Sequence, residues 1–192
     1  MKSFTRRCSV RVVCISGKAR HGKDTVASYM KEEIEKYGNA VRIIHYADLL
    51  KFICREYFDW DGEKDEAGRS LLQFVGTDFV RKQKPSFWVD FVGDLLELFG
   101  SKWDYVLIPD VRFPNEVSGM KERGFDVTHV RVIRPGLRPL LSDSQAMHES
   151  ETAMDSSHPD MSIMNDGSLK DLKKASKDLT ALILHNEIKE RR

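Results

Sequence analysis

The sequence predicts a three-layer, doubly wound α/β fold, in which helices cover both faces of a parallel five-stranded sheet. Five short apolar segments have the β-branched composition of strands that are buried on both faces. They lie at residues 12–16, 41–46, 105–110, 127–133 and 161–164. Much of the chain between them has the apolar period of helices. Because strands that alternate with helices are typical of parallel sheets, we expect ligands at the carboxyl ends of the strands.

The connecting segments are predicted to be mostly helical. Helices are expected at residues 25–38, 48–58, 71–99 and 115–123, and from Ser168 onward. Asp48 is expected to cap the second of these helices. The last helix is expected to bury Leu169, Leu172, Leu179, Leu182 and Ile183. The acidic segment 60–69 is predicted to be a surface loop, and the weakly periodic segment 135–159 suits a mobile lid.

The composition restricts the class of protein. The chain has 192 residues, of which 41% are hydrophobic and 32% charged, as expected for one globular domain. Its net charge of +1 gives no broad field for holding nucleic acid or an anionic membrane. No apolar run is long enough for a membrane span or a signal-peptide core. The three cysteines lack CxxC spacing, so neither a disulfide framework nor a zinc site is indicated, and a reducing cytoplasm is the expected setting.

A glycine-rich loop follows the first predicted strand. Walker A loops have glycine, four residues, Gly-Lys and then serine or threonine. Gly17, Gly22 and Lys23 satisfy this spacing, whereas Asp24 takes the hydroxyl position and Thr25 follows it. Such loops direct backbone N–H groups at phosphate oxygens, and their lysine reaches the β and γ phosphates. We therefore predict a phosphate-binding loop with Lys23 exposed at the ligand; the alternative is a glycine-rich turn that binds nothing.

Further charges occur inside the loop. Lys18, Arg20 and His21 would add positive charge facing a polyphosphate, although Lys18 or His21 can equally be solvated. The carboxylate of Asp24 can coordinate Mg²⁺ directly or through a water molecule.

A second carboxylate ends the strand predicted at 105–110. Asp110 lies where a Walker B carboxylate orients magnesium or its waters. Arg112 follows as a candidate clamp for a phosphate. The alternatives are a turn-forming aspartate and a surface ion pair between Arg112 and Glu116.

With these motifs in place, the chain resembles the deoxynucleoside monophosphate kinases of bacteriophage type over nearly its whole length. The segments that carry the resemblance are SGKARHGKDT (16–25), LQFVGTD (72–78), IPDVR (108–112), RPG (134–136) and NDGSL (165–169). The Gly-Lys-Asp-Thr form of the loop is usual in that family, which accounts for Asp24. The resemblance implies a P-loop fold like that of nucleoside monophosphate kinases. It also implies reversible transfer of the γ-phosphoryl of ATP, with Mg²⁺, to a deoxynucleoside 5′-monophosphate, giving a diphosphate and ADP.

The resemblance also implies roles for particular residues. The implied catalytic residues are Lys23, Arg20, Arg112 and Asp110. The implied magnesium ligands are Asp24 and Asp110. The implied ATP contacts are Gly17, Lys18, Ala19, Arg20, His21, Gly22, Lys23, Asp24, Thr25, Arg134, Arg138, Asn165 and Gly167. The implied acceptor contacts, in a helical region at about 48–100, are Asp48, Gln73, Gly76, Thr77, Arg81, Trp88 and Arg112.

Several of these roles have structural alternatives. Arg81 is expected to hold the acceptor phosphate and Trp88 to stack on the base, although a tryptophan in a helix is more often part of the core. A lid at about 136–158 is expected to close and exclude water. Within it, we favour solvated charges over lid hydrogen bonds for His148, Glu149 and Glu151. The segment from Asn165 to Gly167 is expected to hold adenine, or to cap the last helix.

Two other functions remain open. An animal-type phosphomevalonate kinase resembles this chain in Gly-Lys-Asp, in Asp-x-Arg after a strand, and in Glu149-Ser150-Glu151. A nucleotide-binding regulator without transferase activity would share the fold. Small nucleotides are the implied partners, without nucleic acid or membrane. Which base is accepted, and whether the chain forms a homodimer, cannot be read from the sequence.

Overall fold

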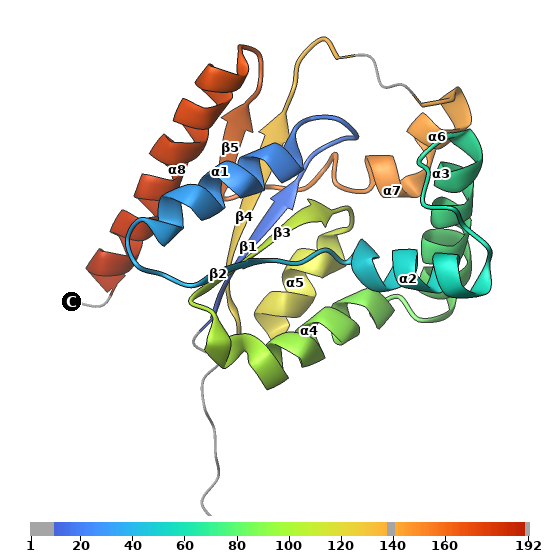
Figure 1. Cartoon of the computed structure of the whole chain (residues 1–192), viewed down its shortest axis with the longest axis horizontal. Helices are drawn as coiled ribbons and strands as arrows, with labels where there is room; N and C mark the ends of the chain where they lie inside the picture. The colour runs from blue at the N-terminus through green and yellow to red at the C-terminus, as the bar shows by residue number, and fades with distance from the viewer. Residues whose placement is uncertain (1–9, 138–140, 191–192) are drawn as a thin grey trace, which may run out of the picture.

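The sheet is parallel throughout and has five strands, as predicted. The computed structural model describes residues 10–137 and 141–190. Its strands are in the order β2-β3-β1-β4-β5 (Figure 1). Their bounds are β1 Arg11–Ser16, β2 Val41–Ile43, β3 Tyr105–Val111, β4 Asp126–Ile133 and β5 Met161–Met164. Because β1 lies in the middle, the loop that follows it opens at the centre of the carboxyl edge of the sheet.

Helices cover both faces of the sheet. α1 (Lys23–Glu35) and α8 (Leu169–Glu190) pack together on one face, whereas α4 (Phe87–Phe99) and α5 (Pro114–Glu122) pack on the other. The remaining helices are α2 (Ala47–Tyr57), α3 (Glu66–Gln73), the π-helix η1 (Phe74–Arg81), the 3₁₀ turn η2 (Gly100–Lys102), α6 (Asp143–Met147) and α7 (Glu149–Thr152). Of these, α2, α3, α6 and α7 lie together to one side of the sheet (Figure 1). Within the described residues, no helix is long and apolar enough to cross a membrane.

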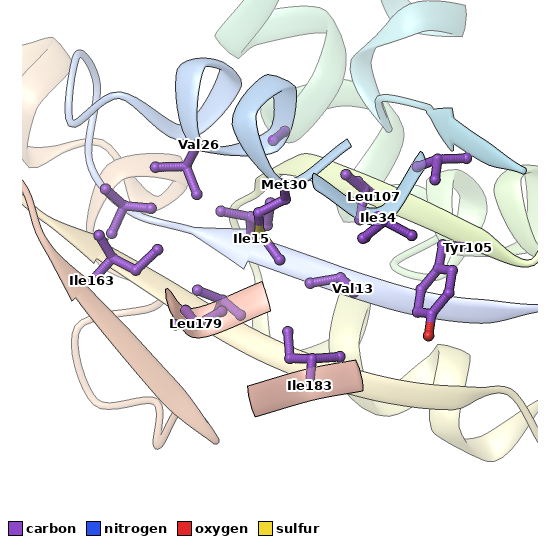
Figure 2. Close-up of a cluster of buried hydrophobic side chains, with 14 of the residues drawn as sticks. Val13, Ile15, Val26, Met30, Ile34, Tyr105, Leu107, Ile163, Leu179 and Ile183 are labelled. Atoms are coloured by element: carbon purple, nitrogen blue, oxygen red, sulfur yellow. The ribbon is translucent and has the colours of Figure 1, made fainter. Parts of the chain in front are cut away.

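The alternation of side chains along β1 divides the core in two. Val13 and Ile15 face the α1 and α8 side, where they pack with Met30 and Ile183 (Figure 2). Val12 and Cys14 face the opposite cluster under α4 and α5. Successive strand residues point to opposite faces, so a continuous apolar run is needed where both faces are covered.

The second strand is shorter than predicted, and Asp48 is not the cap of the next helix. β2 ends at Ile43, and the N-cap of α2 is Tyr46. The backbone N–H of Tyr46 donates to the side chain of Asp110 on β3, whereas the main-chain pairing of β2 with β3 ends at Ile43. Asp48 lies in the first turn of α2, where its Oδ2 accepts from the backbone N–H of His45 at 3.1 Å.

The helical stretch predicted at 71–99 is interrupted and begins earlier. α3 starts at Glu66, inside the predicted 60–69 loop, because Asp65 caps it by accepting from the backbone N–H of Gly68. The π-helix follows α3 directly, and α4 begins at Phe87 after Pro85, which has no N–H to continue a helix.

Two other expectations about helices were incomplete. The described part of the 135–159 segment contains α6 and α7, which are capped by the side chains of Ser142 and His148. In α8, Leu172, Leu179 and Ile183 are buried as predicted, whereas Leu169 is 68% exposed and Leu182 is 57% exposed. The predicted buried face of this helix was therefore too wide.

Candidate active site

The loop between β1 and α1 requires both of its glycines. Gly17 has φ +147° and Gly22 has φ +95°, which L side chains rarely adopt. A Cβ at Gly17 would lie 2.5 Å from the carbonyl oxygen of Val132, and one at Gly22 would lie 2.8 Å from Nδ2 of Asn165. The sequence spacing thus corresponds to a loop that is packed closely between β4 and the residue that follows β5.

Lys23 is buried, so the expectation of an exposed lysine is wrong. It is 7% exposed, and its Nζ donates to the carbonyl oxygens of Gly17 at 2.7 Å and Lys18 at 2.9 Å. Burial, assisted by the positive charge of Arg112, lowers the pKa of Lys23 to about 7. These two hydrogen bonds direct the amine back onto its own loop.

The rest of the loop is held by residues far away in the sequence. Asn165 donates from Nδ2 to the carbonyl oxygen of His21 at 2.9 Å. Nδ1 of His21 lies 3.1 Å from the carbonyl oxygen of Val132 and 3.3 Å from the backbone N of Arg134. Burial lowers the pKa of His21, which favours the neutral ring. Asn165 is therefore positioned to fix the loop. Arg20 is exposed and has φ +64°.

A cleft of about 440 Å³ opens beside this loop. Eleven of the predicted site residues line it, and these are Ala19, Arg20, Lys23, Asp24, Gln73, Gly76, Thr77, Arg81, Trp88, Asp110 and Arg112. Gly17 and Lys18 line a smaller space next to it. Outside both linings lie His21, Gly22, Thr25, Asp48, Arg134, Asn165 and Gly167. Arg138 lies outside the described residues. The structure thus brings together the loop, the end of β3 and the acceptor region expected at about 48–100.

The two candidate metal-binding carboxylates contact the same turn. Asp24 accepts through Oδ1 from Nε2 of His45 at 2.9 Å; this contact lowers the pKa of Asp24 and raises that of His45. Asp110 accepts from the backbone N–H groups of Tyr46 at 3.0 Å and Ala47 at 2.9 Å. Within residues 10–137 and 141–190, no three histidine, cysteine or acidic side chains form a ready metal cluster. Two carboxylates nevertheless suffice for Mg²⁺, which keeps several waters and binds substrate phosphates.

Arg81 faces the cleft, but its guanidinium is already engaged. Nη2 lies 2.6 Å from Oε1 of Glu116, Nη1 donates to Asn115 at 3.0 Å, and the group stacks 3.9 Å above the ring of Phe113. Its Nε is buried and has no hydrogen-bond partner among the described residues. Burial raises the pKa of Glu116 to about 7, against the opposing effect of Arg81. Sequence patterns gave no indication of this pair, whose members are 35 residues apart.

Arg112 does not form the surface ion pair with Glu116 that was its alternative role. Its backbone N–H donates to Glu116 at 2.6 Å, whereas its guanidinium pairs with the carboxylate of Glu151. The solvated state favoured for His148 and Glu151 is therefore wrong for both. His148 lies 3.4 Å from Asp78, and the carboxylate of Glu151 is only 9% exposed. Glu149, between them, is exposed.

Trp88 is mainly a core residue. It is 4% exposed, packs edge-on against Phe87, and donates from Nε1 to the carbonyl oxygen of Gly76 at 3.0 Å. It still contributes to the lining of the cleft. At the other predicted nucleotide contact, Ser168 and Asp171 form the hydrogen bonds that begin α8, and not the segment from Asn165 to Gly167 that the helix-cap alternative named.

Sequence reasoning missed three cations of the cleft, and one of them, Lys51, pairs with Asp48 at 3.4 Å. The other two are Lys64 and Arg69, and neither has an ion-pair or side-chain hydrogen-bond partner within the described residues. Burial lowers the pKa of Lys64, and the charges of Lys51 and Arg69 add to the effect. Lys64 and Arg69 both lie in the segment predicted to be a surface loop. Their presence in an otherwise acidic segment was the available signal.

Comparison with known proteins agrees with this geometry. The family described as deoxynucleotide monophosphate kinase matches residues 42–176, which include Asp110 and Arg112 but not the phosphate loop. The deoxynucleotide monophosphate kinase of Enterobacteria phage T4 is 36% identical over 106 residues, and that of Escherichia phage RB69 is 32% identical. Each match covers 54% of this chain but 41% of the relative, so the alignment spans less than half of the phage proteins.

Solved structures support the fold prediction. A gluconokinase from Sinorhizobium meliloti 1021 has a TM-score of 0.57 at 13% identity, with 97% of this chain and 100% of that chain covered. Dephospho-CoA kinase from Campylobacter jejuni has a TM-score of 0.52 at 10% identity, with 91% and 98% covered. At such identities the likeness concerns the fold alone, which is that of a P-loop kinase. Because the family match extends over well more than half of the sequence, the chain belongs to the deoxynucleotide monophosphate kinase family.

Proposed function

We propose that this protein transfers the γ-phosphoryl of ATP to a deoxynucleoside 5′-monophosphate, giving the diphosphate and ADP. One observation supports this most directly. Lys23 of the loop, Asp110 at the end of β3, Arg69 on α3 and Arg81 on η1 all line one cleft of about 440 Å³. Phosphoryl transfer needs positioning and charge neutralisation more than covalent chemistry, and these groups supply both. Family membership supplies the class of acceptor.

On the donor side, we assign the phosphates of ATP to residues 17–25. The amine of Lys23 would exchange its two carbonyl contacts for phosphate oxygens, and a polyanion would raise its pKa again. Arg20 has no partner within the described residues and lines the cleft, which suits a catalytic cation. Asn165 acts through the loop that it holds, with Arg134 beside it. The adenine would lie toward residues 165–167.

Asp24 and Asp110 are the residues that would hold Mg²⁺. Their oxygen atoms suit a hard cation, and Asp110 is fixed by two backbone N–H groups. When bound, the ion would neutralise negative charge on the phosphates.

On the acceptor side, we assign the monophosphate to Lys64 and Arg69, beside Arg81. Because Glu116, Asn115 and the Phe113 ring already hold the Arg81 guanidinium, Arg81 is anchored in place and contributes its positive charge to this part of the cleft. The unpaired charges of Lys64 and Arg69 are free to meet two phosphate oxygens.

The base and sugar of the acceptor would lie deeper in the cleft. We assign them to the space lined by Gln73, Gly76, Thr77 and Trp88, near Asp48. The described part of the 136–158 segment would close over both nucleotides and exclude water. We expect the protein to act in the cytoplasm, where these nucleotides occur.

The acceptor is tested by a screen of all deoxynucleoside and ribonucleoside monophosphates with Mg-ATP, in a coupled ADP assay and by thermal shift. We expect turnover with one or more deoxynucleotides. Phosphorylation of mevalonate phosphate alone would contradict the proposal, and stabilisation by ATP without transfer to any acceptor would indicate a binding protein.

A charge-matched pair of variants tests the acceptor site. Arg69→Gln should raise KM for the deoxynucleotide about tenfold or more, by loss of a charge-assisted hydrogen bond, and leave KM for ATP nearly unchanged. Arg42→Gln removes the same charge from an exposed position on β2, outside the cleft lining, and serves as the control. Equal kinetics for the two variants would refute the assignment of Arg69.

A further inference from the structure

The carboxylate of Glu151 accepts hydrogen bonds from two donors whose chemistry also suits a phosphate. Its Oε2 accepts from the backbone N–H of Ala19 at 3.1 Å, and its Oε1 accepts from Nη1 of Arg112. Ala19 belongs to the loop after β1, where inward-facing N–H groups bind anions. One internal carboxylate, 9% exposed, therefore satisfies both a loop amide and a nearby guanidinium.

A second acidic residue fixes the same segment over the loop. Asp155 pairs with Lys18 at 3.0 Å and with Arg131 at 3.0 Å. Arg112 also donates to the carbonyl oxygen of Ser150 at 3.3 Å. The space that remains between the loop and this segment measures about 10 Å³, which is about the minimum for one water. A phosphoryl oxygen cannot reach Ala19 N–H and Arg112 together unless Glu151 leaves.

We propose that Glu151 is an internal competitor for the phosphate site, bound to Ala19 and Arg112 until a polyphosphate displaces it. The proposal relies on the proposed function only in taking these two groups as phosphate ligands. A phosphate and a carboxylate use the same donors, but a polyphosphate offers more oxygens and more charge. Donor binding therefore replaces an internal anion instead of filling free donors.

Displacement of Glu151 would be transmitted toward the acceptor side. The segment that contains Glu151 is also attached to α3 through Gln145, whose Nε2 donates to the carbonyl oxygen of Glu66 at 3.0 Å and to Oγ of Ser70 at 3.1 Å. Arg69, proposed for the acceptor phosphate, lies on that helix. Arrival of the donor would thus release one end of a segment whose other end contacts the acceptor region.

The test is calorimetric titration of inorganic tripolyphosphate into the whole chain without acceptor. Glu151→Gln keeps the size of the side chain but removes the charge that pairs with Arg112. Glu149→Gln is the matched control, because it removes the same charge from an exposed position in the same short helix. We expect the Glu151 variant to bind about tenfold more tightly than the control, as loss of one charge-assisted contact from the competing state predicts.

Affinities within twofold of each other, or weaker binding by Glu151→Gln, would overturn the proposal and leave Glu151 as a structural latch. If Glu151→Gln proves unfolded by circular dichroism, Glu151→Asp decides instead. The aspartate side chain is one methylene shorter than that of glutamate, so its carboxylate cannot contact both Ala19 and Arg112. We therefore expect Glu151→Asp to bind tripolyphosphate more tightly than the unmodified chain does. Equal or weaker binding would contradict the proposal. Absence of tripolyphosphate binding in every variant would also refute it. Transferase activity is measured separately, so phosphate binding without transfer would contradict only the proposed function.

Discussion

Replacing Lys23 by methionine should stabilise the fold while it abolishes activity. The fall in the pKa of Lys23 from 10.5 to about 7 means that the folded state disfavours the charged amine. At about 1.4 kcal/mol per pKa unit, the cost is roughly 5 kcal/mol near pH 7. Methionine also forfeits two hydrogen bonds to loop carbonyls, about 1 kcal/mol each. We therefore expect Lys23→Met to be more stable by roughly 3 kcal/mol at pH 7.

The difference in stability between Lys23→Met and the unmodified protein should change with pH. Between the folded pKa of about 7 and the unfolded value of 10.5, the unfolded chain binds more protons than the folded chain. The unmodified protein therefore gains stability relative to Lys23→Met as the pH rises, by at most about 1.4 kcal/mol per pH unit. The two stabilities should become equal near about pH 9, and the order should reverse above it.

Urea unfolding followed by circular dichroism from pH 7 to pH 10 measures the difference. The other titrating groups are the same in both proteins, so their contributions cancel in the stability difference. Lys31→Met, whose lysine lies 3.7 Å from Glu35 on the same helix, should change the stability by less than about 0.5 kcal/mol. A variant that is less stable than the unmodified chain at pH 7, or a gap that does not change with pH, would refute the reasoning.

Three further outcomes are expected. Gly17→Ala should lose about 1–3 kcal/mol more stability in urea than Gly124→Ala, because both glycines have positive φ but only the first would press a Cβ against Val132. Asp110→Asn should lower the stability by about 1 kcal/mol, since it weakens two hydrogen bonds at the start of α2, and should abolish transfer in the ADP assay. Burial lowers the pKa of His129 below 6.5, so its contribution to stability is complete above that pH and is lost as the pH falls. His129→Gln should therefore make unfolding midpoints less sensitive to acid between pH 7 and 5.

The sequence was sufficient for the fold because its strongest signals are local. The run from Val12 to Ile15 is apolar without interruption, and the structure buries its alternate residues in two opposite clusters. The glycine spacing likewise reflects a backbone that needs positive φ at fixed positions. Such constraints act between near neighbours along the chain, so they are visible as periods and spacings.

Contacts between distant residues could not be predicted in this way. The partners of Glu151 lie 132 and 39 residues away, and Glu116 meets Arg81 across 35 residues. Nothing in the spacing of charges shows which acid will meet which base once the strands are ordered. Lys23 was misjudged for another reason: its motif describes the reach of the lysine toward a phosphate, and its spacing does not show that the amine contacts two carbonyl oxygens of its own loop.

The turn formed by residues 45–47 contacts the carboxylates of both Asp24 and Asp110. The side chain of His45 contacts Asp24, and the next two backbone N–H groups contact Asp110. The same turn begins α2, whose residues Leu50 and Lys51 line the cleft. A change of charge on either carboxylate would therefore weaken a contact with the start of that helix. The phosphate site that we propose after β1 and the α2 side of the cleft are therefore joined through three consecutive residues, independently of α6 and α7.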